Sequence, residues 1–380
     1  MANNITALVP DIYEALDIVS RELTGMIPSA TMNASASTAA VGQNIRVDVE
    51  PAGNVSDISP AMVVPDPTGQ TSGSTDIVIT KSRAAEFGFN GDEQLGLQGA
   101  GYQNVRAAKI AQAIRAVTNE VETDLCALQS TFSRAYGTAG TSPFGTANDY
   151  TDASNVLKIL KDNGAPLQDN QLVIDTSAGV NLLGKQAAVA DAGSDSILRQ
   201  GVLLDVNGMP IRESAQVNTS VAGTSANAVS AGAHVVGQTA ITLKASGTGT
   251  IVAGDVITFA GDTNKYVVAT GVAAVSGGAL VIAAPGLLVA QNAGDKAITI
   301  TAAATRNMAF NRSAIVLASR APARPSEGDM ATDVIVITDP RSGLSMEFAM
   351  YKGYRKVRYE VGLAWGVKNI KPEHTALLLG

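Results

Sequence analysis

The sequence contains few of the residues that build catalytic and metal sites. Its 380 residues include one cysteine, Cys126, and two histidines, His234 and His374. One cysteine excludes an internal disulfide framework, and zinc sites draw on several cysteine and histidine ligands. We therefore predict that the protein is not an enzyme and that it has no catalytic residue, no cofactor and no metal site.

Charge and long apolar runs are also scarce. Only 16% of the residues are charged and the net charge is −7, whereas broad electrostatic capture of nucleic acid needs clustered Lys and Arg. No apolar run approaches the roughly 18 residues of a membrane span. No basic residue precedes Arg21, so the N-terminus lacks the charged region of a secretory signal. We expect synthesis in a reducing cytoplasm and no membrane segment.

The N-terminal part of the chain combines a helical pattern with a polar segment. Between residues 5 and 27, apolar residues recur every three or four positions, at Leu8, Ile12, Leu16, Val19 and Leu23. This spacing predicts a short amphipathic helix. The small and polar residues of 28–42 then predict an extended arm with no core of its own.

Two strand patterns flank a long segment rich in Pro, Gly, Ser and Asp. Apolar and polar residues alternate over 44–50, and DIVITK follows at 76–81. Loops this long are uncommon inside compact domains and are usually functional. The segment is either a flexible surface loop or a hairpin arm that lies across a neighbouring subunit.

Charged residues gather on and around this hairpin. They are either surface charges or partners in salt bridges to adjacent subunits, and we take them as candidate inter-subunit contacts. The candidates are Arg46, Asp48, Asp57, Asp66, Asp76, Lys81 and Arg83.

A long helical pattern extends from about residue 103 to residue 136. Its apolar stripe consists of Ile114, Val117, Val121, Leu125, Leu128 and Phe132. Such a helix would be roughly 50 Å long and would end at Gly137. The charged residues outside the stripe are expected to be solvated: Arg106, Lys109, Arg115, Glu120 and Glu122. A helix with one apolar face needs a layer to lie on, so we interpret this one as the spine of a domain.

Helix and strand patterns alternate after the long helix. We predict a helix at 151–163, a strand at 171–175, a helix containing Leu182 and Leu183, and a tight turn at Asn207-Gly208. The run from Gly179 to Gln186 partly matches a phosphate loop. That loop needs Ser or Thr after its lysine, so we do not predict nucleotide binding.

Composition changes abruptly over residues 218–305. This part is almost wholly Ala, Gly, Val, Thr, Ser and Ile, with short β-rich runs between glycines. Regular short strands with turns between them predict a small barrel or sandwich, inserted within a larger domain. After residue 305 the composition returns to that of the earlier segments. Strand patterns follow at 331–339 and 344–354, and the chain ends with a strand-like run and an apolar tail.

The order of these segments resembles the coat proteins of tailed bacteriophages with the Hong Kong 97-type fold, most closely the branch of short-tailed enterobacterial phages. GNVSDISPAMVVPDP with DIVITKSRAAEFGF is similar to the family's extended loop, and residues 92–136 are similar to its spine helix. GTIVAGDVITFAG is similar to the barrel inserted in that branch. MAFNRSAIVLASRAPARP, DPRSGLSMEFAMYKGY and YEVGLAWGVKNIKPEHTALLLG are similar to the family's C-terminal signature.

The resemblance, which covers nearly the whole chain, implies an α+β fold with these parts. They are an N-terminal helix and arm (1–43), an extended β-hairpin loop (44–86), a peripheral domain with the spine helix (87–165), an axial domain (166–217, 306–332 and 353–380), an inserted β-barrel module (218–305) and returning strands of the peripheral domain (333–352).

The resemblance also implies a function. It implies a major capsid protein that assembles as hexamers and pentamers into an icosahedral head enclosing double-stranded DNA without sequence-specific binding. The partners would be a scaffolding protein and a portal protein at one vertex, with room for a decoration protein, and the location would be the virion. Two alternatives stay open: the shell protein of an encapsulin-type bacterial nanocompartment, and a β-rich surface or adhesive protein.

Overall fold

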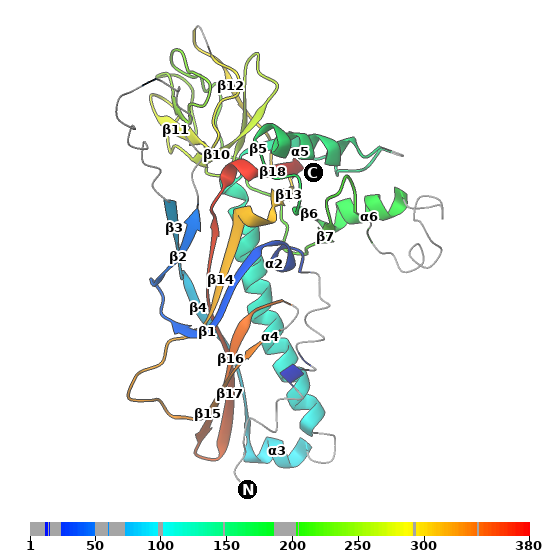
Figure 1. The fold of residues 1–380 in the computed structure, drawn as a ribbon, viewed down its shortest axis with the longest axis vertical. Helices are drawn as coiled ribbons and strands as arrows, with labels where there is room; N and C mark the ends of the chain where they lie inside the picture. Colours follow the sequence, from blue (N-terminus) through cyan, green and yellow to red (C-terminus); the bar gives the residue numbers. More distant parts are fainter. Residues whose placement is uncertain are drawn as a thin grey trace.

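The computed structural model describes residues 12, 13, 15, 24–49, 60, 73–97, 102–146, 149–185, 203, 205–291, 294–339 and 342–380. The molecule is elongated. A six-stranded sheet and helix α4 (Tyr102–Ala127) run along its long axis, and a ten-stranded sheet lies towards one end (Figure 1).

The six-stranded sheet is built around its longest strand, β17. Its order is β1-β14-β17-β16-β15, with β4 on β17 as well. The two strand patterns predicted at 331–339 and 344–354 are confirmed as the antiparallel pair β15–β16. The strands are β1 (Thr31–Ala39), β4 (Lys81–Asn90), β14 (Ile315–Pro322), β15 (Ala331–Thr338), β16 (Ser345–Gly353) and β17 (Lys356–Asn369).

Helix α4 covers one face of this sheet and confirms the predicted apolar stripe. Ile114, Val117, Val121 and Leu125 are buried in the cluster that also holds Trp365 of β17. At 1.5 Å per residue the helix is about 39 Å long. It is preceded by the short helix α3 (Gly91–Leu97).

The predicted end of the long helix is wrong. α4 ends at Ala127, and the chain continues through the 3-10 helix η2 (Leu128–Thr131) into strand β5 (Arg134–Gly137). Leu128 and Phe132 keep the apolar spacing because they still pack on the same core. A pattern of buried positions therefore continued past the point where the helical backbone stops.

Most of the helix predicted at 5–27 lies outside the described residues, but Ile12, Tyr13 and Ala15 are helical as predicted. A separate short helix, α2 (Met26–Ser29), follows the non-helical residues 24 and 25. The prediction of an arm with no core is wrong for residues 31–39. They form β1, which pairs in parallel with β14 from Thr31↔Val316 to Ala39↔Pro322. This partner lies far away in the sequence, so no local pattern could reveal it.

The ten-stranded sheet carries the predicted α/β segment. Its order is β12-β9-β10-β5-β18-β13-β6-β7, with β11 and β8 joined through β10. The helix predicted at 151–163 is confirmed as α5 (Thr151–Asp162), and the strand predicted at 171–175 as β6 (Asn170–Ile174). The remaining elements here are α6 (Thr176–Lys185), β7 (Ile211–Glu213), β13 (Arg306–Asn311), the 3-10 helices η3 (Arg312–Ala314) and η4 (Pro372–His374), and β18 (Thr375–Leu379).

The C-terminal strand and one turn fix this part of the fold. β18 is buried along its whole length, between β13 and β5. The tight turn predicted at Asn207-Gly208 is confirmed: both residues have positive φ and Val206 bridges Met209.

The module at 218–305 begins and ends at one place, where Thr219 bridges Thr305. It holds β8 (Ala240–Thr242), β9 (Val256–Phe259), β10 (Lys265–Thr270), β11 (Ala279–Ile282) and β12 (Ile298–Ile300) around a core of its own. The hydrogen bonds run in a closed circuit. β8, β11, β10, β9 and β12 follow one another, and residues 228–231 bond β12 at one side and β8 at the other. Through β10 and β5 the circuit joins the main sheet.

A candidate assembly surface

The predicted hairpin forms a two-stranded ladder of its own. β2 (Asn44–Val49) pairs with β3 (Gly73–Val78) in antiparallel register from Asn44↔Val78 to Val49↔Gly73. Its base is anchored because Ile77 and Ile79 are buried against residues of β14 and β17. Figure 1 shows β2 and β3 beside the long sheet. The hairpin therefore has a packed base, and β2 and β3 form a ladder only with each other among the described strands. One side chain of the long sheet reaches the stem, since Lys368 Nζ donates to Asp76 O at 2.9 Å.

The candidate contact residues of the hairpin stem are solvent-exposed. Arg46 stands opposite Asp76 in the ladder, and its Nε lies 3.9 Å from Asp48 Oδ1 with both side chains more than two-thirds exposed. Exposed pairs of this kind contribute at most about 1 kcal/mol. These charges remain available to a partner. Asp57 and Asp66 lie outside the described residues.

Lys81, in contrast, is held within its own chain. Its Nζ lies 2.8 Å from Asp124 Oδ1 and 3.2 Å from Glu120 Oε1, both on α4. The bond to Asp124 outweighs partial burial and raises the pKa of Lys81 above its ordinary value. Asp124 also accepts a hydrogen bond from Trp365 Nε1 at 2.8 Å. Lys81 thus fastens β4 to the long helix.

Arg83, the last candidate, is more exposed than Lys81. Its Nε lies 3.5 Å from Glu120 Oε1, and 62% of its side chain is accessible. Of the predicted contact residues that the structure describes, Arg46, Asp48, Asp76 and Arg83 present charge to solvent. The structure contains no partner chain, so their role between subunits remains a prediction.

A buried carboxylate that the sequence pattern did not indicate joins three segments of the chain. Glu122 was predicted to be solvated, but it is fully buried. Its Oε1 accepts hydrogen bonds from Met26 N and Ser214 Oγ, each at 2.7 Å, and its Oε2 accepts one from Ile27 N at 3.0 Å. Burial raises the pKa of Glu122, and these hydrogen bonds oppose the rise. Its position off the apolar stripe gave no signal, because the donors come from segments distant in sequence.

A second missed group of charges lies on the sheet face opposite α4. Arg324 pairs with Glu347 (Nη2 to Oε1, 2.8 Å) and with Asp329 (Nη1 to Oδ2, 2.9 Å). Arg358 pairs with Glu86 and Glu360 on the same sheet. This face therefore carries charge where α4 covers the other face with apolar side chains.

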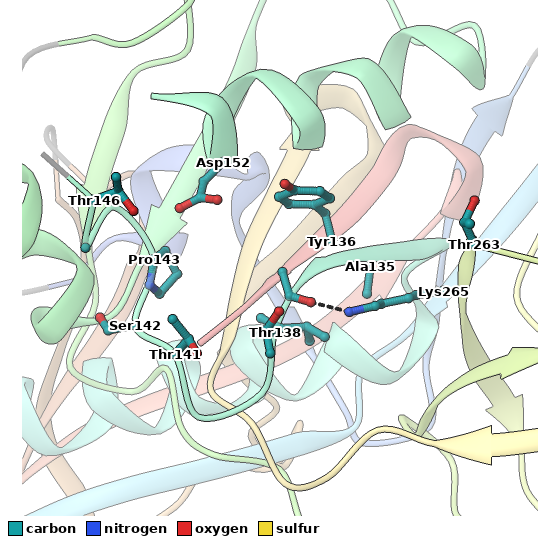
Figure 2. A pocket seen from close by; sticks show the side chains of 13 residues that line it. Ala135, Tyr136, Thr138, Thr141, Ser142, Pro143, Thr146, Asp152, Thr263 and Lys265 are labelled. Carbon is teal, nitrogen blue, oxygen red and sulfur yellow. Dashed lines mark hydrogen bonds between the residues drawn. The ribbon is translucent and has the colours of Figure 1, made fainter. Parts of the chain in front are cut away.

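The pocket in Figure 2 is the other candidate site. It has a volume of about 380 Å³ and lies where β5 and the chain after it meet the module and the end of β18. Lys265 Nζ donates to the backbone oxygen of Gly137, and Asp152 Oδ2 accepts from Phe144 N at 2.8 Å. Burial lowers the pKa of Lys265. Both charged groups among the described lining residues are therefore engaged in holding the fold.

The residues that partly match a phosphate loop are part of a helix, and the lysine among them is bonded within the chain. Gly179 and Lys185 lie in helix α6, and Lys185 Nζ donates to the backbone oxygen of Thr146 at 2.6 Å. No group of three or more His, Cys, Asp or Glu side chains suited to a metal occurs in the described part of the chain. Among the same residues, no helix has the length and apolar character needed to cross a membrane.

Several solved structures resemble the chain over most of its length. The capsid of Cyanophage P-SCSP1u is 11% identical, with 92% of this chain and 86% of that chain covered and a TM-score of 0.47. The mature capsid of bacteriophage PhiM1 is 10% identical, with 94% and 86% covered and a TM-score of 0.46. A virus-like particle from Pyrococcus furiosus is 10% identical, with 97% and 98% covered and a TM-score of 0.41. Likenesses of this size carry no argument about function.

No protein-family model and no curated protein matches the chain.

Proposed function

We propose that this chain is the major capsid protein of a tailed bacteriophage. It assembles as hexamers and pentamers into an icosahedral head that encloses double-stranded DNA, without sequence-specific contacts. The observation that carries the proposal is the β2–β3 hairpin, which is anchored at its base by Ile77 and Ile79 and whose stem strands pair only with each other.

A hairpin of this kind needs a surface to lie on. An isolated two-stranded ladder is marginally stable in water, and the ordering of its chain costs about 1–2 kcal/mol per residue. Arg46, Asp48 and Asp76 stay exposed on its stem. A neighbouring subunit that covers the hairpin supplies both packing and charge partners. Head-to-tail contacts between copies close into rings, which are the units of a shell.

The rest of the fold supports the same proposal through the family resemblance. α4 serves as the spine helix of a peripheral domain (87–165 and 333–352). Residues 166–217, 306–332 and 353–380 serve as the axial domain. They contain α6, β6, β7, β13 and β18 of the ten-stranded sheet region, and also β14 and β17 of the six-stranded sheet. The closed hydrogen-bond circuit at 218–305 serves as an inserted barrel, as in the coat proteins of short-tailed enterobacterial phages.

The partners follow from the same proposal. A scaffolding protein guides assembly, a portal protein occupies one vertex, and the outer surface leaves room for a decoration protein. The protein is made in the cytoplasm of a bacterial host and ends in the virion. As a shell subunit it needs no catalytic site and no cofactor.

Removal of the hairpin tip tests the proposal. Residues 53–70 are replaced by a short Gly-Ser linker, which leaves β2 and β3 in place. Fluorescence of Trp365, the only tryptophan, and thermal unfolding should match the parent chain, because the tip contributes no described residue to the core around Trp365. Closed particles should be lost in electron micrographs. Normal particles from this variant would rule out the role given to the hairpin.

The contents of purified particles separate the proposal from a nanocompartment. Double-stranded DNA and a portal inside or on the particles are expected. An enzyme cargo without DNA would favour the encapsulin-type alternative. A β-rich surface protein would form no closed particle in either case.

A further inference from the structure

The six-stranded sheet has three edge strands, β1, β4 and β15, and the last two are unlike. β4, outermost on one side of β17, carries Lys81, Arg83 and Glu86. β15, outermost beyond β16 on the other side, reads Ala-Thr-Asp-Val-Ile-Val-Ile-Thr, with Asp333 as its only charge. Proteins usually protect edge strands with lysines, prolines or bulges, since an open edge is a template for pairing with another chain. β4 has several charges. β15 has one charge and a register shift between Ala331 and Asp333, and it has no lysine or proline.

The backbone of β15 offers hydrogen-bonding groups to that open side. Asp339 N donates to Leu344 O at 2.9 Å, and the β15–β16 register then runs without a shift from Thr338↔Ser345 to Asp333↔Met350. In an antiparallel ladder, alternate residues point both backbone groups at the partner and the residues between them point both away. Val336 and Thr338 therefore direct their N–H and C=O groups towards an edge that no described strand covers. Val334 directs its C=O there, while its N–H donates to Asp333 Oδ1 at 2.9 Å.

The side chains of β15 make the edge apolar on both faces. Val334 is 37% exposed, and Met330, just before the strand, is 84% exposed. Ile335 and Val336 are partly exposed on opposite faces. A β-branched, nearly uncharged strand with an open edge is an aggregation hazard in a free subunit. A specific partner that covers the edge removes the hazard.

We propose that β15 pairs with β15 of a second copy, antiparallel, around a two-fold axis perpendicular to the sheet. The proposal rests on the shell function above. Copies in one shell must keep the same face inwards, and a half-turn about an axis normal to the sheet leaves α4 on the same side in both copies. It also sets two identical edges antiparallel, as an isologous contact requires.

Geometry and charge limit the registers open to this pair, and we propose the one centred on Ile335. Side chains that oppose each other across the pair must point to the same face of the joined sheet. Because successive residues of a strand alternate between the faces, odd-numbered residues oppose odd-numbered ones and even-numbered residues oppose even-numbered ones. A pair centred on Val336 would set Asp333 opposite Asp339, and like charges directly opposite are destabilising. A pair centred on Ile335 sets Asp333 opposite Ile337 and Val334 opposite Val336, and residues 332–338 overlap. In that register Ile335 opposes its own copy.

Cysteine cross-linking tests this register directly. The chain's own Cys126 is buried in α4, so it should not form disulfides with an introduced cysteine. Opposed residues that are not hydrogen-bonded have Cα atoms about 4.5 Å apart, within the range for a disulfide. Oxidised Ile335→Cys particles should run mainly as disulfide-linked dimers on a non-reducing gel. Ala84→Cys, exposed on β4, should stay monomeric.

A proline pair separates docking from folding. Val336→Pro removes an N–H that points out of the sheet, and edge strands tolerate proline in that orientation. This variant should fold, with parental Trp365 fluorescence, but should lose closed particles. Ile335→Pro removes a bond of the β15–β16 ladder and should lower the melting temperature of the subunit itself.

The outcomes distinguish this inference from the shell function. Closed particles in which Ile335→Cys forms no dimer, or closed particles from Val336→Pro, would overturn the β15 pairing and leave the shell function intact. A parent chain that forms no particles would count against the shell function. Dimers of Ile335→Cys in solution would then still support the pairing.

Discussion

The carboxylate of Glu122 accepts a hydrogen bond from the backbone N–H of Met26 at 2.7 Å across 96 residues of sequence. Together with its bonds to Ile27 and Ser214, this contact ties the N-terminal segment to the long helix and to the chain that leaves β7. All three donors are buried, so the fold depends on this one side chain to satisfy them.

Substitution of Glu122 should therefore weaken the subunit. In Glu122→Gln one carboxylate oxygen becomes an NH₂ group that faces donors. A buried donor left unsatisfied costs about 1–3 kcal/mol, so we expect a loss on the order of 3 kcal/mol in the free energy of unfolding. Chemical denaturation followed by Trp365 fluorescence measures it. Glu120→Gln, on the same helix but one-third exposed, should lose about 1 kcal/mol or less.

The effect of Glu122 should also depend on pH. Burial raises its pKa above the ordinary value near 4.5, so the folded protein holds this proton at a pH where the unfolded chain has lost it. Its contribution to stability is then fully present at acidic pH and falls as the pH rises through the folded pKa. The free energy of unfolding of the parent and of Glu122→Gln should be measured from pH 4 upwards. The difference between the two values, the gap, should narrow as the pH rises. A gap that widens would contradict the assignment.

Gly137 should tolerate no side chain, because its φ of +101° is unfavourable for other residues and a Cβ would lie 2.6 Å from the backbone oxygen of Leu379. Gly137→Ala should cost about 2–4 kcal/mol. Gly140→Ala is the matched control, since φ is +78° there but no atom lies within 4 Å of the added Cβ. It should cost about 1 kcal/mol. Equal melting temperatures for the two variants would disprove the close approach of β5 and β18.

The Asp124 carboxylate should stabilise the contact between α4 and the sheet. Asp124→Asn weakens its bonds to Lys81 Nζ and Trp365 Nε1, and we expect a loss of about 1–2 kcal/mol, reduced by solvent at the Lys81 side. Trp365 emission should change as well, because its indole loses a charged acceptor. Asp162→Asn, which breaks an exposed pair with Lys158 on α5, should change stability by about 0.5 kcal/mol at most and leave the emission unchanged.

Local patterns in the sequence predicted the elements that depend on local chemistry. The apolar stripe of α4, the alternation in β2 and the Asn207-Gly208 turn each follow from neighbouring residues and are confirmed. The strand pattern at 331–339 likewise predicted β15, which pairs with β16 in the structure.

The errors arose where distant residues decide the structure. β1 was predicted to be a coreless arm because its partner β14 lies far along the chain. The helix was predicted to continue past Ala127 because Phe132 still faces the same core. Glu122 was predicted to be solvated because its donors at Met26 and Ser214 cannot be read from α4. Of the candidate contacts, Lys81 proved to be held by Asp124 and Glu120 within the chain.

Electron microscopy of the purified chain, expressed alone and with the scaffolding protein proposed above, tests the shell function most directly. A shell subunit should form uniform closed shells, or rings of five and six subunits where closure fails. A stable monomer at high concentration under both conditions would contradict it.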